Sequence, residues 1–205
     1  MRSDQNKMLS NLAGLFFISG FSALIYQVCW QRLLFTGFGV DLTSITIIIS
    51  VFMLGLGIGA FWGGRLADIY SDRIILIFTL IELGIGIFGL VSKNLIILLQ
   101  TLLLDSSQVT MAIFSFLLLL FPTFLMGMTL PLLTSFFNRY IQNIGSSIGG
   151  LYFFNTLGAS LGALSTGFIF FNYMTLSQTI FIASSLNVFI AFCIYSTYGI
   201  KKNEA

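Results

Sequence analysis

One acidic residue, Glu82, lies in the middle of an apolar run from Ile74 to Val91 that is long enough to form most of a membrane-spanning helix. It is the only acidic residue near the midplane of any candidate span. A carboxylate at that depth costs about 3 kcal/mol unless a partner compensates it, and such residues usually mark a solute or ion pathway. Glu82 is therefore the first candidate for binding a charged solute. The alternative is a pairing with another helix that controls conformation.

Polar and aromatic side chains in three other apolar runs could complete a site around Glu82. Ser19, Ser22, Tyr26 and Trp30 recur at intervals of three, four and four residues, so a helix carries them on one face. The remaining candidates are Gln27 beside this stripe, Asn155 and Thr156 in the fifth run, and Asn187 near the middle of the sixth. A carboxylate, amides and aromatic rings together suit a small organic cation, because ring faces attract an ammonium group.

These side chains also have a purely structural interpretation. Asn, Ser and Thr often hydrogen-bond across membrane helices, where each bond contributes roughly 0.6 kcal/mol. Tyr26 and Trp30 stand near the end of the first apolar run, so they could belong to an aromatic belt at the membrane surface. The sequence leaves both interpretations open.

The composition places all these residues in a membrane protein. Of 205 residues, 57% are hydrophobic and 8% are charged, whereas soluble domains average about 25% charged residues. The net charge of +2, with scattered basic residues, gives no reason to expect a nucleic-acid partner. The chain has no histidine, and Cys29 and Cys193 fall in separate runs, so we expect no metal site, no cofactor and no enzymatic activity.

We predict an all-α integral membrane protein, with a single six-helix domain over residues 1–205 embedded in the lipid bilayer. The expected spans are about 11–33, 43–64, 74–92, 109–137, 147–171 and 176–198. The apolar segment 95–104 is too short to cross a bilayer, at about 15 Å as a helix. It either lies in the membrane surface or extends a neighbouring helix.

Basic residues predict the orientation, because cytoplasmic loops are enriched in Lys and Arg. With an even number of spans and the N-terminus inside, two basic residues, Arg32 and Lys93, face outward. Seven face the cytoplasm: Arg2, Lys7, Arg65, Arg73, Arg139, Lys201 and Lys202. We therefore expect a multi-pass protein of the cell (inner) membrane with both termini in the cytoplasm.

Glycines recur every four residues in two of the expected helices, at Gly55, Gly59 and Gly63 and again at Gly158 and Gly162. Small residues at this spacing let helix backbones approach closely. The two helices are the second of their respective triplets, as a three-plus-three inverted repeat predicts, and such repeats underlie many transporters. The alternative is that glycine is simply common in membrane helices.

Both prolines, Pro122 and Pro131, lie in the fourth span with Gly127 between them. Each proline removes a backbone hydrogen bond and bends or loosens a helix. This stretch could act as a hinge that lines a cavity or moves, or it could be a simple packing kink.

The segment 64–73 resembles the loop between the second and third helices of major facilitator transporters. That family has Gly-x-Leu-Ala-Asp followed by a basic residue, matched here by Gly64, Leu66, Ala67, Asp68 and Arg73. Ile69 and Ser71 depart from the family, which commonly has Arg and Gly there. The resemblance implies a six-helix half of that fold, with Asp68, Arg73 and Arg65 as a conformational latch. The alternative is an ordinary solvated loop.

A second resemblance covers nearly the whole chain. Five blocks in order are similar to the membrane domain fused to spermidine-synthase-like proteins: residues 17–32, 52–57, 82–86, 126–133 and 152–159. In that family an aminopropyltransferase-like domain usually follows the membrane part, whereas residues 1–205 resemble the membrane part alone. The resemblance implies the six-helix fold and a link to polyamine-like metabolism, without implying an enzyme.

We therefore expect a half-size transporter of a small cationic or polyamine-like metabolite. It would pair with a second copy, because major facilitator proteins have two six-helix halves. The alternative is a non-transporting anchor or partner subunit for a separately encoded spermidine-synthase-like enzyme. An intramembrane enzyme is disfavoured, because the sequence has no clustered acids and no serine–base pair.

Overall fold

The apolar runs fold into helices because a backbone in lipid must satisfy its hydrogen bonds within itself. The computed structural model describes residues 2–38, 42–141 and 143–199, and over these ranges it contains helices and no strands. Six helices are long and apolar enough to span a membrane, which confirms the prediction of an all-α, multi-pass protein. The elements are α1 (Arg2–Phe38), α2 (Leu42–Ile69), η1 (Ser71–Arg73), α3 (Ile74–Leu102), α4 (Gln108–Ile141), α5 (Ile144–Ser165), η2 (Thr166–Phe170), α6 (Phe171–Tyr173), α7 (Leu176–Ile194) and η3 (Tyr195–Gly199).

The third span is longer than the sequence predicted. The expected end at residue 92 is wrong, because α3 runs through Lys93 and Asn94 as far as Leu102. The apolar segment after residue 94 therefore extends α3 and does not lie separately in the membrane surface. Neither Lys nor Asn stops a helix as proline does, and the Lys93 amine donates to the Ser177 hydroxyl at 2.5 Å, beside the start of α7.

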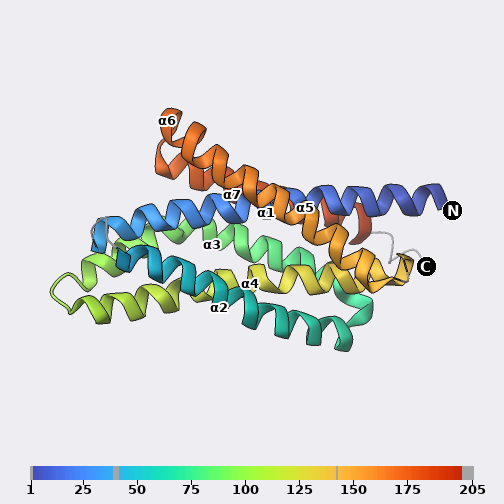
Figure 1. The fold of residues 1–205 in the computed structure, drawn as a ribbon, viewed down its shortest axis with the longest axis horizontal. Helices are drawn as coiled ribbons and strands as arrows, with labels where there is room; N and C mark the ends of the chain where they lie inside the picture. Colours follow the sequence, from blue (N-terminus) through green and yellow to red (C-terminus); the bar gives the residue numbers. More distant parts are fainter. Residues whose placement is uncertain (1, 39–41, 142, 200–205) are drawn as a thin grey trace.

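The helices pack side by side along the long axis of the molecule (Figure 1). The two most extensive pairings join α2 to α4 and α1 to α5, while α3 packs against both α7 and α4, and α7 also contacts α1. The start of α1, the η1 turn and the end of α7 all lie at one end of the bundle (Figure 1). Arg65, Arg73 and Arg139 stand near this end, which we call the basic end.

Glycines explain how closely the paired helices approach. Gly59 of α2 lies against the backbone carbonyl of Phe124 in α4, and Gly158 of α5 lies against the carbonyl of Phe17 in α1. A Cβ atom at either glycine would overlap that carbonyl oxygen, so no larger residue fits without moving a helix. Gly63 and Gly162 make similar contacts, and Gly55 lies against the Thr123 side chain, which confirms the close approach expected of these strips.

α4 continues through both of its prolines. Beside Pro122, the Thr123 hydroxyl donates to the Leu119 carbonyl of its own helix at 2.9 Å and lies 3.3 Å from the Val51 carbonyl of α2. Gly127 rests against the Leu56 backbone of α2. The stretch is thus packed against α2 in this conformation, and a hinge made by Pro122, Gly127 and Pro131 stays a prediction.

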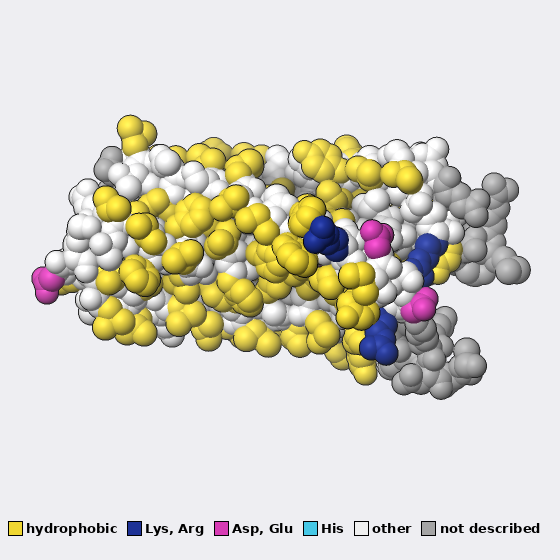
Figure 2. All heavy atoms as spheres, turned by 90° about the horizontal axis from the view of Figure 1, so that it is seen from below, with side chains coloured by type: hydrophobic (Ala, Val, Ile, Leu, Met, Phe, Trp, Pro, Cys, Tyr) yellow, Lys and Arg dark blue, Asp and Glu magenta, His cyan; other side chains and the backbone are white. Residues whose placement is uncertain are grey.

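The outer surface is that of a protein in lipid. Figure 2 shows hydrophobic side chains along one flank, charged side chains gathered toward one end, and an acidic side chain at the other. α5 is the least buried of the long helices, with large side chains such as Phe153, Leu161 and Leu164 exposed in a single copy of the chain. The flank seen in Figure 2 is therefore suited to a bilayer or to another apolar partner.

Candidate functional site

Glu82 lies in the interior of the bundle and has no exposed surface. Both of its carboxyl oxygens accept hydrogen bonds from neighbouring helices. The Ser19 hydroxyl of α1 donates to Oε1 at 2.6 Å, and the Asn187 amide of α7 donates through Nδ2 to Oε2 at 2.6 Å. We call Glu82, Ser19 and Asn187, together with Tyr26 beside them, the Glu82 cluster. It joins α1, α3 and α7 through side chains alone.

The close approach of α7 to α3 explains how Asn187 reaches Glu82. Gly86 stands one turn after Glu82, and a Cβ atom there would lie 2.9 Å from Val188 Cγ2 of α7 and 3.3 Å from the Ser184 carbonyl. The Ser184 hydroxyl donates to the Gly86 carbonyl at 2.6 Å. A glycine at this position therefore lets α7 settle against the α3 backbone and presents Asn187 to the carboxyl group.

No positive side chain that the structure describes bonds to Glu82. Within the described residues its hydrogen-bond partners are a hydroxyl and an amide, and it makes no ion pair. Among the described residues, two neutral donors thus bind the Glu82 carboxyl group, and a cationic solute as its partner stays a prediction. Arg32 of α1 is exposed, and its guanidinium lies over the Phe171 ring, 4.6 Å from the centroid.

The predicted stripe on α1 is confirmed as a single buried face. Ser19, Ser22, Tyr26 and Trp30 are all buried, and the alternative that Tyr26 and Trp30 form a surface aromatic belt is wrong. Their rings stack with centroids 5.1 Å apart, and Trp30 Nε1 donates to the Ser92 hydroxyl of α3 at 3.0 Å. The stripe therefore pins α1 to α3 along their length.

The hydroxyl group of Tyr26 lies against Gly89 of α3. Ser184 lies beside that hydroxyl, but no hydrogen bond of good geometry joins them. The Ser22 hydroxyl donates to the Ser19 carbonyl of its own helix at 2.9 Å, so it serves α1 alone. Gln27 is half-buried beside the stripe and is not among the hydrogen-bond partners of Glu82.

Asn155 and Thr156 do not join Glu82, so the expectation of one shared cavity is wrong for these two residues. Asn155 is half-buried and donates through Nδ2 to the Phe16 carbonyl at 3.2 Å, which is a packing contact between α5 and α1. Thr156 is exposed and lines a shallow depression on the outer face of α5 with Tyr152 and Ser160. The rotation of α5 is set by the face that carries Gly158 and Gly162, which must turn toward α1.

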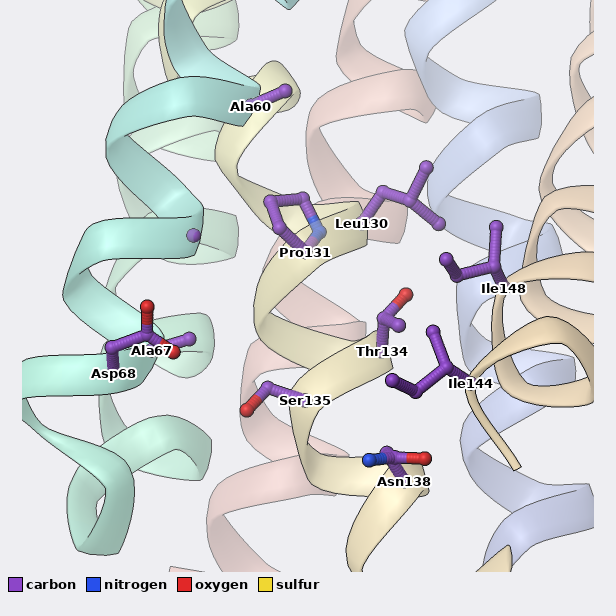
Figure 3. Close-up of a pocket in the computed structure, with 11 residues that line it drawn as sticks. Ala60, Ala67, Asp68, Leu130, Pro131, Thr134, Ser135, Asn138, Ile144 and Ile148 are labelled. Atoms are coloured by element: carbon purple, nitrogen blue, oxygen red, sulfur yellow. The ribbon is translucent and has the colours of Figure 1, made fainter. Parts of the chain in front are cut away.

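A second candidate region lies near the basic end, where residues of α2, α4 and α5 line an open pocket of about 360 Å³ (Figure 3). Its polar lining is Asp68 from α2 and Thr134, Ser135 and Asn138 from α4. Apolar residues make up the rest: Ala60, Gly64, Ala67, Leu130, Pro131, Ile144 and Ile148. We call this the Asp68 pocket. A volume of this size admits a small organic molecule, for which pockets of about 300–1,000 Å³ are usual.

Several polar groups of the Asp68 pocket lack partners. Asp68 is exposed and makes no hydrogen bond or ion pair with the described residues. Thr134 Oγ1 and Asn138 Oδ1 are buried atoms that receive no hydrogen bond from the described part of the chain. Figure 3 shows both side chains on α4, between Asp68 of α2 and Ile144 of α5. The residues that line this partly apolar pocket thus include one acid and two side chains with an oxygen atom that has no hydrogen-bond partner among the described residues.

The predicted latch is not assembled in this conformation. The Arg65 guanidinium lies over the Phe61 and Trp62 rings, 4.4 and 5.5 Å from their centroids, and does not pair with Asp68. The side chain of Arg73 has no hydrogen-bond or ion-pair partner in the ranges described. Arg139 instead donates to the Ser71 carbonyl and ties the end of α4 to the η1 turn. A latch made by Asp68, Arg73 and Arg65 stays a prediction.

Sequence reasoning missed Thr134, Ser135 and Asn138 as pocket residues. Thr134 and Asn138 are four residues apart and share one helix face, so their pairing could have been noticed, but not the cavity beside them. The described residues bring together no group of three or more His, Cys, Asp or Glu side chains that could hold a metal ion. No family model, no curated protein and no solved structure matches this chain.

Proposed function

We propose that this chain is a half-size membrane transporter that works as a homodimer and carries a small organic cation of the polyamine type. The single observation that carries the transporter assignment is a set of helix contacts that repeats along the chain in constant register. The charge of the solute is inferred from the Asp68 pocket, and the polyamine class from the resemblance to spermidine-synthase-like membrane domains.

Three glycine contacts in one helix pair have counterparts in another. Between α1 and α5, each glycine faces a carbonyl of the other helix: Gly158 faces Phe17, Gly162 faces Phe21, and Gly20 faces Asn155. Between α4 and α2 the contacts are the same: Gly59 faces Phe124, Gly63 faces Met128, and Gly127 faces Leu56. Adding 107 to each α1 number and subtracting 99 from each α5 number converts the first set into the second.

This register supports an internal repeat in which α1, α2 and α3 correspond to α4, α5 and α7. Both helix pairs carry the same Gly-Ala-x-x-Gly spacing, beginning at Gly59 and at Gly158. A unit of three spans reverses direction at each copy, so the second unit is inverted relative to the first. Inverted repeats of this kind form many secondary transporters, whose motion rocks one unit or half against another. A second copy of the chain supplies the other half.

The Asp68 pocket is where the solute is best accommodated. The carboxyl group of Asp68 is unpartnered among the described residues, whereas that of Glu82 is enclosed and already satisfied. The pocket adds an apolar wall that suits the methylene chain of an amine. Its lining includes the hydroxyl and amide side chains of Thr134, Ser135 and Asn138, a residue set that can accept from N–H groups. With the basic end assigned to the cytoplasm, both termini are cytoplasmic and the pocket opens inward.

Uptake into liposomes tests the proposal. Purified protein is reconstituted and the uptake of labelled putrescine or spermidine is measured for wild type, Asp68→Asn, and Asp105→Asn as a control in the loop at the opposite end. We expect Asp68→Asn to lower uptake by at least about tenfold, because it removes the charge that meets the ammonium group. Asp105→Asn should match wild type.

A folded wild-type protein that moves no polyamine in either direction would contradict the proposal. In that case, stable copurification with a soluble synthase-like protein would support the alternative of an anchor or partner subunit. A monomer in nanodiscs, seen by mass measurement at the concentration used for transport, would contradict the dimer.

A further inference from the structure

We propose that Glu82 is a proton-binding site, and that the proton is the coupling ion of the transporter. This inference rests on the proposed function, because coupling has meaning only if a solute is moved. It starts from the enclosure of the Glu82 carboxyl group, which has no exposed surface and holds its two donors at 2.6 Å. A proton is the one positive ligand that needs no cavity of its own.

The neighbours of Glu82 can satisfy the carboxyl group in both of its protonation states. In the structure, Ser19 and Asn187 each donate one hydrogen bond, as an ionised carboxylate requires. Asn187 Oδ1 is buried and accepts no hydrogen bond from the described residues. Turning the amide by half a rotation presents this oxygen to Glu82, where it can accept from a carboxyl O–H. The Ser19 hydroxyl can likewise donate or accept.

Among the described residues, no charged side chain bonds to Glu82, and the titratable side chain described in η3, which also contacts α3, is the exposed Tyr195. The titratable side chains that α1 brings toward Glu82 are Tyr26 and, one turn farther, Cys29, and α7 carries only Cys193, two turns beyond Asn187. α4, which also packs against α3, has no titratable residue between Gln108 and Asn138. Within the described ranges, a negative charge on Glu82 is therefore balanced only when a proton binds.

Proton binding and release at Glu82 form and later break one O–H bond. Water at one membrane surface gives up a proton, an O–H bond forms on Glu82, and the same proton later returns to water at the opposite surface. No other bond changes order. Proton binding reverses the direction of the hydrogen bond to Asn187, so the link between α3 and α7 differs in the two states. These are the third helices of the two units in the proposed repeat, and their contact is where such a change would act.

Infrared spectroscopy of the full-length protein in lipid detects this proton directly. We expect wild type to show the carbonyl band of a protonated carboxylic acid, which shifts in D₂O and decreases reversibly as the pH is raised. Glu82→Gln should lack the band, and Asp105→Asn should keep it. Asn187→Leu should shift it, because a hydrogen-bond partner of the acid is lost.

The outcomes separate this inference from the function on which it rests. A band that is identical in wild type and Glu82→Gln overturns the proton site, as does a Glu82 band that never titrates between about pH 5 and about pH 10. If the band titrates but no polyamine is transported, the transporter assignment fails while Glu82 remains a proton-binding group. If transport occurs, a pH gradient should drive it in wild type and should lose its effect in Glu82→Gln. Transport that is driven equally in both proteins contradicts proton coupling through Glu82.

Discussion

The two acids of interest, Glu82 and Asp68, have similar side chains and opposite surroundings. Glu82 is fully enclosed and holds two neutral donors, whereas Asp68 is exposed, lines a cavity and has no partner among the described residues. The first arrangement fixes three helices together and the second leaves a charge available. The acid that is buried most deeply is therefore not the one with room for a solute, although its place in the middle of an apolar run makes it the stronger candidate in the sequence.

The largest effect is expected for Asn187→Leu, compared with Asn138→Leu. Asn187→Leu removes the donor to Glu82 Oε2 and leaves a buried oxygen unpaired, which should lower stability by about 2–3 kcal/mol. Asn138→Leu removes an amide oxygen that has no partner in the described structure and should not destabilise the protein. Thermal unfolding in detergent, followed by the fluorescence of Trp30 and Trp62, gives both values. Equal losses of stability in Asn187→Leu and Asn138→Leu would contradict the difference between the Glu82 cluster and the Asp68 pocket.

Filling the Asp68 pocket should impair transport without harming the fold. Ala60→Trp places a large ring against the cavity, and we expect uptake to fall by about tenfold, equivalent to about 1.4 kcal/mol. Stability should change by less than about 0.5 kcal/mol, because Ala60 is exposed. The control is Met53→Trp, which adds a similar ring to an exposed position of α2 outside the pocket. If the two variants transport equally well, the pocket does not contact the solute.

Ser19→Ala tests the other hydrogen bond of the Glu82 cluster. It removes the donor to Oε1, and we expect a loss of about 1 kcal/mol, near the upper range for hydrogen bonds between membrane helices. Ser22→Ala is the matched control, since its hydroxyl bonds only to a carbonyl of its own helix, and it should cost less than about 0.5 kcal/mol. Denaturant titration of both variants measures the difference. A larger loss for Ser22→Ala would contradict the assigned geometry.

The smallest effect is expected for Thr134→Val in the Asp68 pocket. The Thr134 Oγ1 atom is buried without a partner among the described residues, so replacing it by a methyl group should leave stability unchanged or raise it by about 0.5 kcal/mol. Thr129→Val on the same helix removes a hydroxyl that donates to the Met126 carbonyl at 2.7 Å, and it should be mildly destabilising. The unfolding temperature of Thr134→Val should therefore be higher than that of Thr129→Val, and the reverse order would contradict the prediction.

Much of the helical framework could be predicted, because hydropathy and glycine spacing are properties of one helix at a time. The stripe of Ser19, Ser22, Tyr26 and Trp30 needed only the helical period to be placed on one face. The end of α3 could not be predicted, since a Lys-Asn pair after an apolar run is equally compatible with a loop and with a helix leaving the membrane. These local signals do not specify how far a helix continues beyond the bilayer.

The partners of Glu82 and the Asp68 pocket depend on how whole helices are rotated and spaced. Asn155 and Asn187 look alike in sequence, yet only Asn187 reaches Glu82, because Gly86 admits α7 to α3. Asn155 shares with Gly158 the face of α5 that packs on α1, where it bonds to the Phe16 carbonyl. The pocket arises where the ends of three helices diverge. Neither arrangement has a local pattern in the sequence that would reveal it.

The hydroxyl end of Tyr26 fits against Gly89 so tightly that a methyl group on that glycine would overlap it. Together with the bonds from Ser19 to Glu82 and from Trp30 to Ser92, this contact interlocks α1 and α3 over several turns. A piston-like slide of one helix past the other would have to disengage all three contacts at once. We therefore expect α1 and α3 to move together, with changes of shape occurring at their contacts with the other helices.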